Sequence, residues 1–209
     1  PFVTNYEPKN ISLIGQTWSV MQDNDGIMYF GTINGIIEYD GVRWDRVLFD
    51  SIPPLTVRSL TRDNNGTIYY GGTSDFGYLT KDSLGRTKGV SLLKFVPGEY
   101  RNFFDIWSSY ATPEGVYFQS REYIFFVNNQ HRVKVWKPKS KFTYSFYIDG
   151  NYFVHQQGLG LYKLVSDSFA FIPGSEFLGK ERMQVMLPYT PTGTTGTGVG
   201  NKQYFIGMF

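Results

Sequence analysis

The chain of 209 residues is long enough to bury a sizeable core. Its formal net charge of +2 is spread along the sequence and forms no basic stripe, so we expect no nucleic acid to be bound by this segment. Cysteine is absent, which excludes disulfides, thiolate metal sites and cysteine nucleophiles. Aromatic residues make up 18% of the chain and 23 glycines interrupt it, a composition that favours short β-strands joined by tight turns.

An internal repeat begins near the amino terminus. Residues 18–47 read WSVMQDNDGIMYFGTINGIIEYDGVRWDRV. This pattern predicts an apolar strand, an Asp/Asn/Gly turn, an aromatic strand ending in Gly-Thr, a glycine turn and two further strands. Residues 57–79 read VRSLTRDNNGTIYYGGTSDFGYL and repeat this order. We expect the Asp/Asn/Gly turns to have a structural role, because each supplies a residue that tolerates the positive φ of a tight hairpin.

Weaker copies of the repeat follow. One occupies residues 106–136, a second occupies 143–172, and a fifth begins with MQVMLPY at 183–189 and resumes near residue 203. Four short strands in each unit are typical of propeller blades, because a four-stranded sheet with two apolar faces needs a neighbour on each side. An irregular β-sandwich is a less favoured alternative, since its turns would not repeat one ordered motif.

The sequence therefore predicts an all-β fold, a partial β-propeller of about four to five four-stranded blades. We expect a single propeller segment over residues 1–209. The expected blades are listed by residue: 11–50, 55–97, 103–137, 141–173 and 181–209, the last incomplete.

Three segments carry a resemblance to a known family. They are 22–32 (QDNDGIMYFGT), 34–41 (NGIIEYDG) and 58–60 (RSL). With its weaker downstream copies, the chain resembles the two-component regulator propeller family, the extracytoplasmic sensor region of Bacteroidetes-type bacterial sensor and regulator proteins. The resemblance implies a periplasmic or other extracytoplasmic location and a signalling output in other domains of the same protein. It also implies a larger ring of blades, so we expect a fragment with an exposed edge that favours homo-oligomers.

The sequence contains no recognisable catalytic or metal-binding motif. The two histidines, His131 and His155, fall in different repeats, and no nucleophile elbow occurs. The acidic turns lack the alternating oxygen ligands and distal glutamate of a calcium loop. We therefore expect no enzyme activity, no cofactor and no metal.

Four residues near the innermost strands are candidates for ligand binding: Trp18, Arg58, Trp107 and Tyr144. Three aromatic rings and a guanidinium suit an oligosaccharide or another small ligand. Packing between blades is the alternative, above all for the two tryptophans, whereas Arg58 requires a carboxylate, a carbonyl or a ligand to satisfy it.

The sequence thus favours a non-catalytic, ligand-sensing propeller segment of a two-component-type signalling protein, and the resemblance suggests a glycan as the ligand. A protein–protein interaction or dimerisation scaffold is the alternative. A propeller lyase or glycosidase is less favoured.

Overall fold

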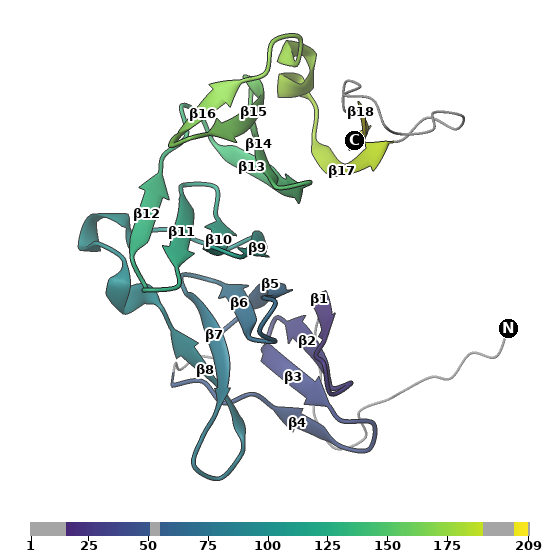
Figure 1. The fold of residues 1–209 in the computed structure, drawn as a ribbon, viewed down its shortest axis with the longest axis vertical. Helices are drawn as coiled ribbons and strands as arrows, with labels where there is room; N and C mark the ends of the chain where they lie inside the picture. Colours follow the sequence, from purple (N-terminus) through teal and green to yellow (C-terminus); the bar gives the residue numbers. More distant parts are fainter. Residues whose placement is uncertain (1–15, 51–54, 190–202, 209) are drawn as a thin grey trace, which may run out of the picture. The chain divides into compact units, whose positions relative to one another are not determined.

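The computed structural model describes residues 16–50, 55–189 and 203–208 (Figure 1). Its described residues divide into two compact units, one within Pro1–Ser120 with Ile124–Val135 and the other within Arg121–Tyr123 with Trp136–Phe209. Regular structure in the described residues consists of antiparallel β-sheets and three short 3-10 helices. None of the described helices is long and apolar enough to cross a membrane.

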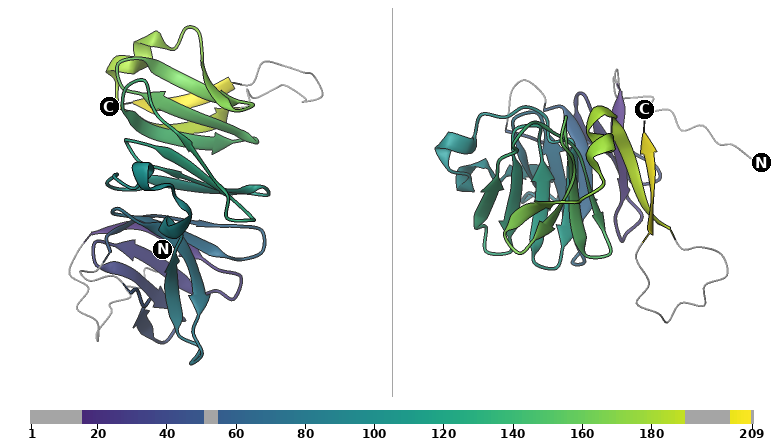
Figure 2. Two further views of the ribbon diagram at one scale, coloured as in Figure 1. Left: turned by 90° about the vertical axis from the view of Figure 1, so that its left-hand side faces the viewer. Right: turned by 90° about the horizontal axis from the view of Figure 1, so that it is seen from above.

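The first unit contains three four-stranded sheets, and in each the strands are paired in sequence order. Figure 2 shows the strands of these sheets from two further directions. The first sheet is β1 (Thr17–Gln22), β2 (Met28–Thr32), β3 (Gly35–Tyr39) and β4 (Trp44–Arg46). The second is β5 (Val57–Arg62), β6 (Ile68–Gly72), β7 (Phe76–Lys81) and β8 (Thr87–Ser91). The third is β9 (Ser108–Thr112), β10 (Gly115–Gln119), β11 (Ile124–Asn128) and β12 (Val133–Trp136), whose last residue belongs to the second unit.

The second unit contains a fourth four-stranded sheet and a two-stranded sheet. The former is β13 (Phe142–Ile148), β14 (Asn151–Gln156), β15 (Gly160–Val165) and β16 (Ser168–Phe171). A 3-10 helix at Glu176–Lys180 leads to the hairpin of β17 (Met183–Tyr189) and β18 (Gln203–Met208). The all-β prediction is confirmed, and the described part of the last repeat holds two strands.

The Asp/Asn/Gly turns of the first two repeats use the same hydrogen bonds. The Oδ1 atom of Asp63 accepts the backbone N–H groups two and four residues later, both at 2.9 Å, and its Oδ2 accepts the hydroxyl of Tyr69 at 3.3 Å. Asp23 makes the same three bonds, the last with Tyr29. Burial and the nearby carboxylate raise the pKa of Tyr69 to about 12, so its hydroxyl remains a donor at neutral pH. The turn aspartates are therefore occupied in fastening the following strand.

Close contact between sheets forms the core of the first unit. Phe76 of β7 and Phe118 of β10 stack with their ring centroids 4.4 Å apart. A Cβ on Gly71 would collide with the side chains of Ile106 and Ser59, so the absence of a side chain allows the second and third repeats to approach. Further apolar packing lies between the first two sheets: Tyr29, Ile36, Val47, Leu55, Val57, Leu60, Ile68 and Tyr70.

The core of the second unit joins the fourth sheet to the hairpin. Its buried members are Phe153, Leu161, Leu178, Met183 and Met186. His155 of β14 lies within this unit and is 1% exposed. Its Nε2–H donates to the backbone oxygen of Leu178 at 2.8 Å, so Nδ1 accepts the hydroxyl of Thr143 at 2.5 Å. Both ring nitrogens are satisfied in the neutral form, which indicates a structural role for this histidine.

Burial lowers the pKa of His155 below its usual 6.5, so the stability of the folded chain depends on pH. As the pH falls below about 6.5, the unfolded chain takes up a proton that folded His155 resists, so unfolding becomes easier. We expect the melting temperature to fall more steeply between pH 7.5 and pH 5.5 in the wild type than in His155→Gln. Circular dichroism melts of both proteins measure this difference. Equal slopes would contradict a buried neutral histidine.

Candidate ligand-binding site

The first strands of successive sheets lie beside one another in the first unit, β1 next to β5 and β5 next to β9. In both β1 and β5 the pairing register slips by one residue near the start of the strand. Thr17 pairs with Thr32 but Ser19 pairs with Gly31, so Trp18 is the extra residue.

Arg58 occupies the same position in β5, because Val57 pairs with Gly72 and Ser59 pairs with Gly71. A β-bulge of this kind redirects the side chain of the extra residue. The two predicted site residues therefore lie at equivalent bulges of neighbouring strands.

Trp107 reaches the same place by a different route. It immediately precedes β9, where the register is regular from Ser108 onward, and its backbone N–H donates to the oxygen of Gln119 at 2.8 Å. Trp107 is thus held at the start of the third sheet without a bulge.

Arg58 lies between the two tryptophans. Its guanidinium carbon is 4.2 Å from the ring centroid of Trp18 and 4.5 Å from that of Trp107. The two rings are 6.1 Å apart and nearly perpendicular, at 85°. Cation–π attraction at these distances holds the planar guanidinium in one orientation. The structure therefore brings together three of the four predicted residues.

A carboxylate that the sequence analysis did not single out completes the site. Asp105 places Oδ2 2.6 Å from Nε of Arg58, and its Oδ1 accepts the hydroxyl of Thr73 at 2.5 Å. The Arg58 and Asp105 side chains are 18% and 16% exposed. The sequence predicts that Arg58 needs a hydrogen-bond acceptor or a carboxylate partner. It does not identify Asp105 as that partner.

The site retains unused binding capacity. Asp105 forms an ion pair with Arg58, but Nε and Nη1 of Arg58 are both buried with no hydrogen-bond partner among the described residues. An unpaired buried donor costs about 1–3 kcal/mol, so an oxygen acceptor brought to Nη1 would recover part of that free energy. Trp18 is 39% exposed and provides an apolar surface beside it.

Tyr144, the fourth predicted residue, belongs to the second unit. It lies in a similar irregularity of β13, where the pairing moves from Phe142 with Gln156 to Ser145 with Val154. Its side chain is half-buried. Tyr144 therefore shares the strand position of Trp18 and Arg58 but belongs to a different unit.

Among the described residues, no three histidine, aspartate or glutamate side chains group in a way that could hold a metal ion.

Breaking the contact between Arg58 and Asp105 is expected to lower the unfolding free energy. Because both side chains are largely buried, we expect a coupling energy of about 1–3 kcal/mol in a double-mutant cycle of Arg58→Ala and Asp105→Asn. The pair of Arg86 and Asp82, whose arginine side chain is 60% exposed against 18% for Arg58, is the control and should couple by less than about 0.5 kcal/mol. Urea denaturation measures both cycles, and equal coupling in the two would contradict the ion pair described above.

Comparison with known proteins gives one match in sequence. No family model matches the chain. A protein of Schizosaccharomyces pombe named as a probable acid phosphatase is 31% identical over 107 residues. The match covers 49% of this chain and 23% of the yeast protein, so the chain spans about a quarter of that relative's length.

Solved structures resemble the chain over most of its length. The extracellular domain of BT4673 from B. thetaiotaomicron, described as a hybrid two component system, matches 85% of the chain with a TM-score of 0.59 and 12% identity. A catalytically inactive virginiamycin B lyase from Staphylococcus aureus with quinupristin matches 88% with a TM-score of 0.62 and 16% identity. The WD40 β-propeller domain of Doa1 matches 83% with a TM-score of 0.60 and 10% identity.

The chain covers 24%, 62% and 59% of these three chains, respectively. Identities this low show a common fold. The chain has the fold of part of a β-propeller, and its resemblance to the two-component regulator propeller family is confirmed at the level of the fold.

Proposed function

We propose that the chain is a non-catalytic, ligand-binding segment of an extracytoplasmic β-propeller sensor of the two-component type. The observation that carries this proposal is the Arg58 guanidinium, held between Trp18 and Trp107 with a buried N–H group that has no hydrogen-bond partner among the described residues. The structural likeness to the extracellular domain of BT4673 supports the sensor part of the proposal.

The charges of the site favour an uncharged glycan as the ligand. Asp105 already compensates Arg58, so an anionic ligand would meet repulsion from the carboxylate as well as attraction from the guanidinium. A sugar hydroxyl or ring oxygen needs only a donor such as Nη1. The C–H face of a sugar also packs well on an aromatic ring such as that of Trp18.

A ligand at this site would act on the arrangement of the repeats. Trp18 and Arg58 lie in the first two sheets of the first unit, and Trp107 immediately precedes the third. A glycan that contacts all three would favour one packing of those sheets over others. Such differential binding is the physical requirement for a signal to reach neighbouring domains.

Trp18→Ala tests the proposal directly. We expect the wild type to bind at least one of cellohexaose, maltohexaose and mannohexaose, and to bind anionic hexagalacturonate more weakly. Loss of the indole should weaken binding by about tenfold, because an aromatic contact contributes about 1.5 kcal/mol. Isothermal titration calorimetry measures the affinities.

Trp44→Ala is the matched control, because Trp44 lies on β4 of the same sheet and stacks on Tyr39. Its affinity should equal that of the wild type. The absence of binding to all four hexasaccharides would contradict the proposal. Turnover of 4-nitrophenyl phosphate, or cleavage of quinupristin or of a hexasaccharide that binds, would contradict its non-catalytic part.

A second candidate function is protein–protein association through the hairpin of β17 and β18. The cross-strand pair of Leu187 and Phe205 is 53% and 60% exposed, and Val185, Tyr189 and Met208 are exposed as well. In the described residues β18 pairs only with β17, whereas the second strand of each other sheet pairs on both sides. An apolar face beside an open strand edge favours pairing with another chain.

This second candidate predicts that the wild type elutes as an oligomer and that Phe205→Lys shifts it towards the monomer. Lysine on an edge strand opposes pairing by its charge and hydration. Val42→Lys, at a residue that is 84% exposed in a turn of the first unit, is the control and should leave the oligomer intact. Size-exclusion chromatography with light scattering measures the mass. A wild-type monomer would exclude self-association as the function of this hairpin.

A further inference from the structure

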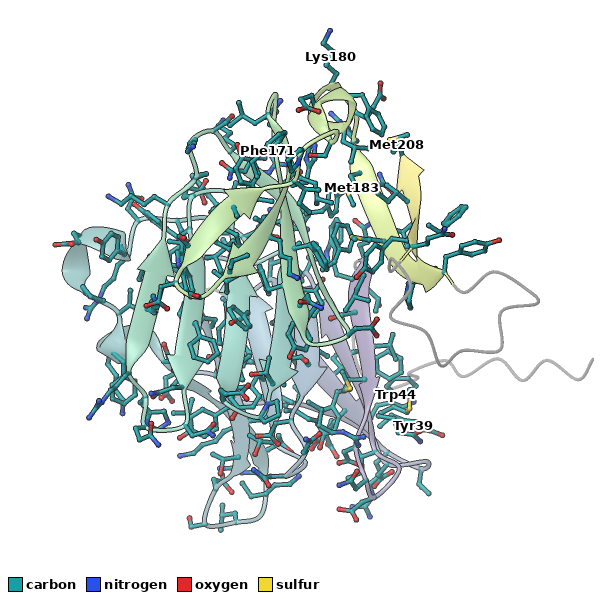
Figure 3. All side chains as sticks on the ribbon, turned by 45° about the horizontal axis from the view of Figure 1, so that its top comes forward. Tyr39, Trp44, Phe171, Lys180, Met183 and Met208 are labelled. Atoms are coloured by element: carbon teal, nitrogen blue, oxygen red, sulfur yellow. The ribbon has the colours of Figure 1, made fainter. Side chains whose placement is uncertain are left out.

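The bulge that presents Trp18 and Arg58 also occurs in the second unit, at a residue that the sequence analysis did not single out. In β17, Met183 pairs with Met208 but Val185 pairs with Gly207, so Gln184 is the extra residue. Figure 3 shows the labelled side chains of Met183 and Met208 at this end of the hairpin. Since β13 has its own irregularity between Phe142 and Ser145, where Tyr144 lies, four of the five first strands described share this feature.

The position of the bulge is the same each time. It lies near the start of the first strand of a sheet, and these first strands are neighbours within each unit: β1 beside β5, and β13 beside β17. In the first unit the two bulge residues, Trp18 and Arg58, contact each other directly. Tyr144 and Gln184 therefore hold corresponding places on neighbouring strands of the second unit.

The side chain of Gln184 is exposed although the residue before it is buried. Met183 is completely buried in the core of the second unit and fixes the start of β17, whereas Gln184 is exposed. A core position immediately before the bulge holds the backbone, so the bulge determines where the next side chain points. The exposure of Gln184 results from its register as well as from its polarity.

We infer that Tyr144 and Gln184 form a second glycan-contacting subsite, built on the bulges of β13 and β17. This inference rests on the proposed function and extends it to the second unit. The phenol ring supplies a face for a sugar ring, and the amide supplies one acceptor and two donors for hydroxyl groups. The Gln184 amide carries no charge, which matches the charge-compensated site at Arg58.

The inference is tested on the ¹⁵N-labelled chain by NMR, with cellohexaose, maltohexaose, mannohexaose and hexagalacturonate added in turn. The indole N–H signals of Trp18 and Trp107 report the first site, and those of Trp44 and Trp136 serve as internal references. The side-chain amide signals of Gln184, assigned by their loss in Gln184→Glu, report the second. We expect the signals of both sites to shift with an uncharged hexasaccharide.

Affinities of variants complete the test. Gln184→Ala should weaken binding about three- to tenfold, as expected for the loss of one or two hydrogen bonds. Gln203→Ala is the matched control, because Gln203 is an exposed glutamine on β18 outside any bulge, and it should bind as the wild type does. Tyr144→Phe should keep most of the affinity that Tyr144→Ala loses. Melting temperatures of all variants check that each is folded.

The two proposals fail in different ways. Shifts at Trp18 and Trp107 without a shift at Gln184, together with wild-type affinity in Gln184→Ala, would overturn the second subsite and leave the proposed function standing. The absence of shifts at every one of these residues would overturn both.

Discussion

The packing of one sheet directly on the next is the constraint on which the other features depend. A four-stranded sheet with two apolar faces buries only one of them against a single neighbour, so each repeat requires others for its stability. The first unit satisfies this requirement by close approach, with Phe76 stacked on Phe118 and with Gly71 leaving room for Ile106. This approach sets the first strands of neighbouring sheets side by side and so decides which side chains meet.

The β-bulge turns this arrangement into a candidate binding surface. One extra residue near the start of the first strand changes the direction in which its side chain points. This irregularity of the pairing recurs in β1, β5, β13 and β17. Because the bulge is a property of the backbone, the side chain at that position is free to vary. The residues found there are a tryptophan, an arginine, a tyrosine and a glutamine, all of which suit recognition of polar, ring-shaped ligands.

Electrostatics narrow the chemistry of the first site. Arg58 is stabilised by two aromatic faces and by the carboxylate of Asp105, so its charge is balanced, while its Nη1 has no hydrogen-bond partner among the described residues. The second unit provides a contrast in His155, whose ring nitrogens are both satisfied and whose burial keeps it neutral. A partly unsatisfied group beside exposed aromatic surface indicates a binding role, and a fully satisfied buried group indicates a structural one.

The sequence alone determined the local structure: the strands, their repeat and turns such as that at Asp63 follow from hydrogen bonds and φ angles that neighbouring residues dictate. It also selected Trp18, Arg58 and Trp107. Only the tertiary structure decided that these three meet, that Asp105 is the partner of Arg58 and that Gln184 occupies a bulge. The reason is that strand register and contacts between sheets depend on residues far apart in the chain, whose pairing no local pattern encodes.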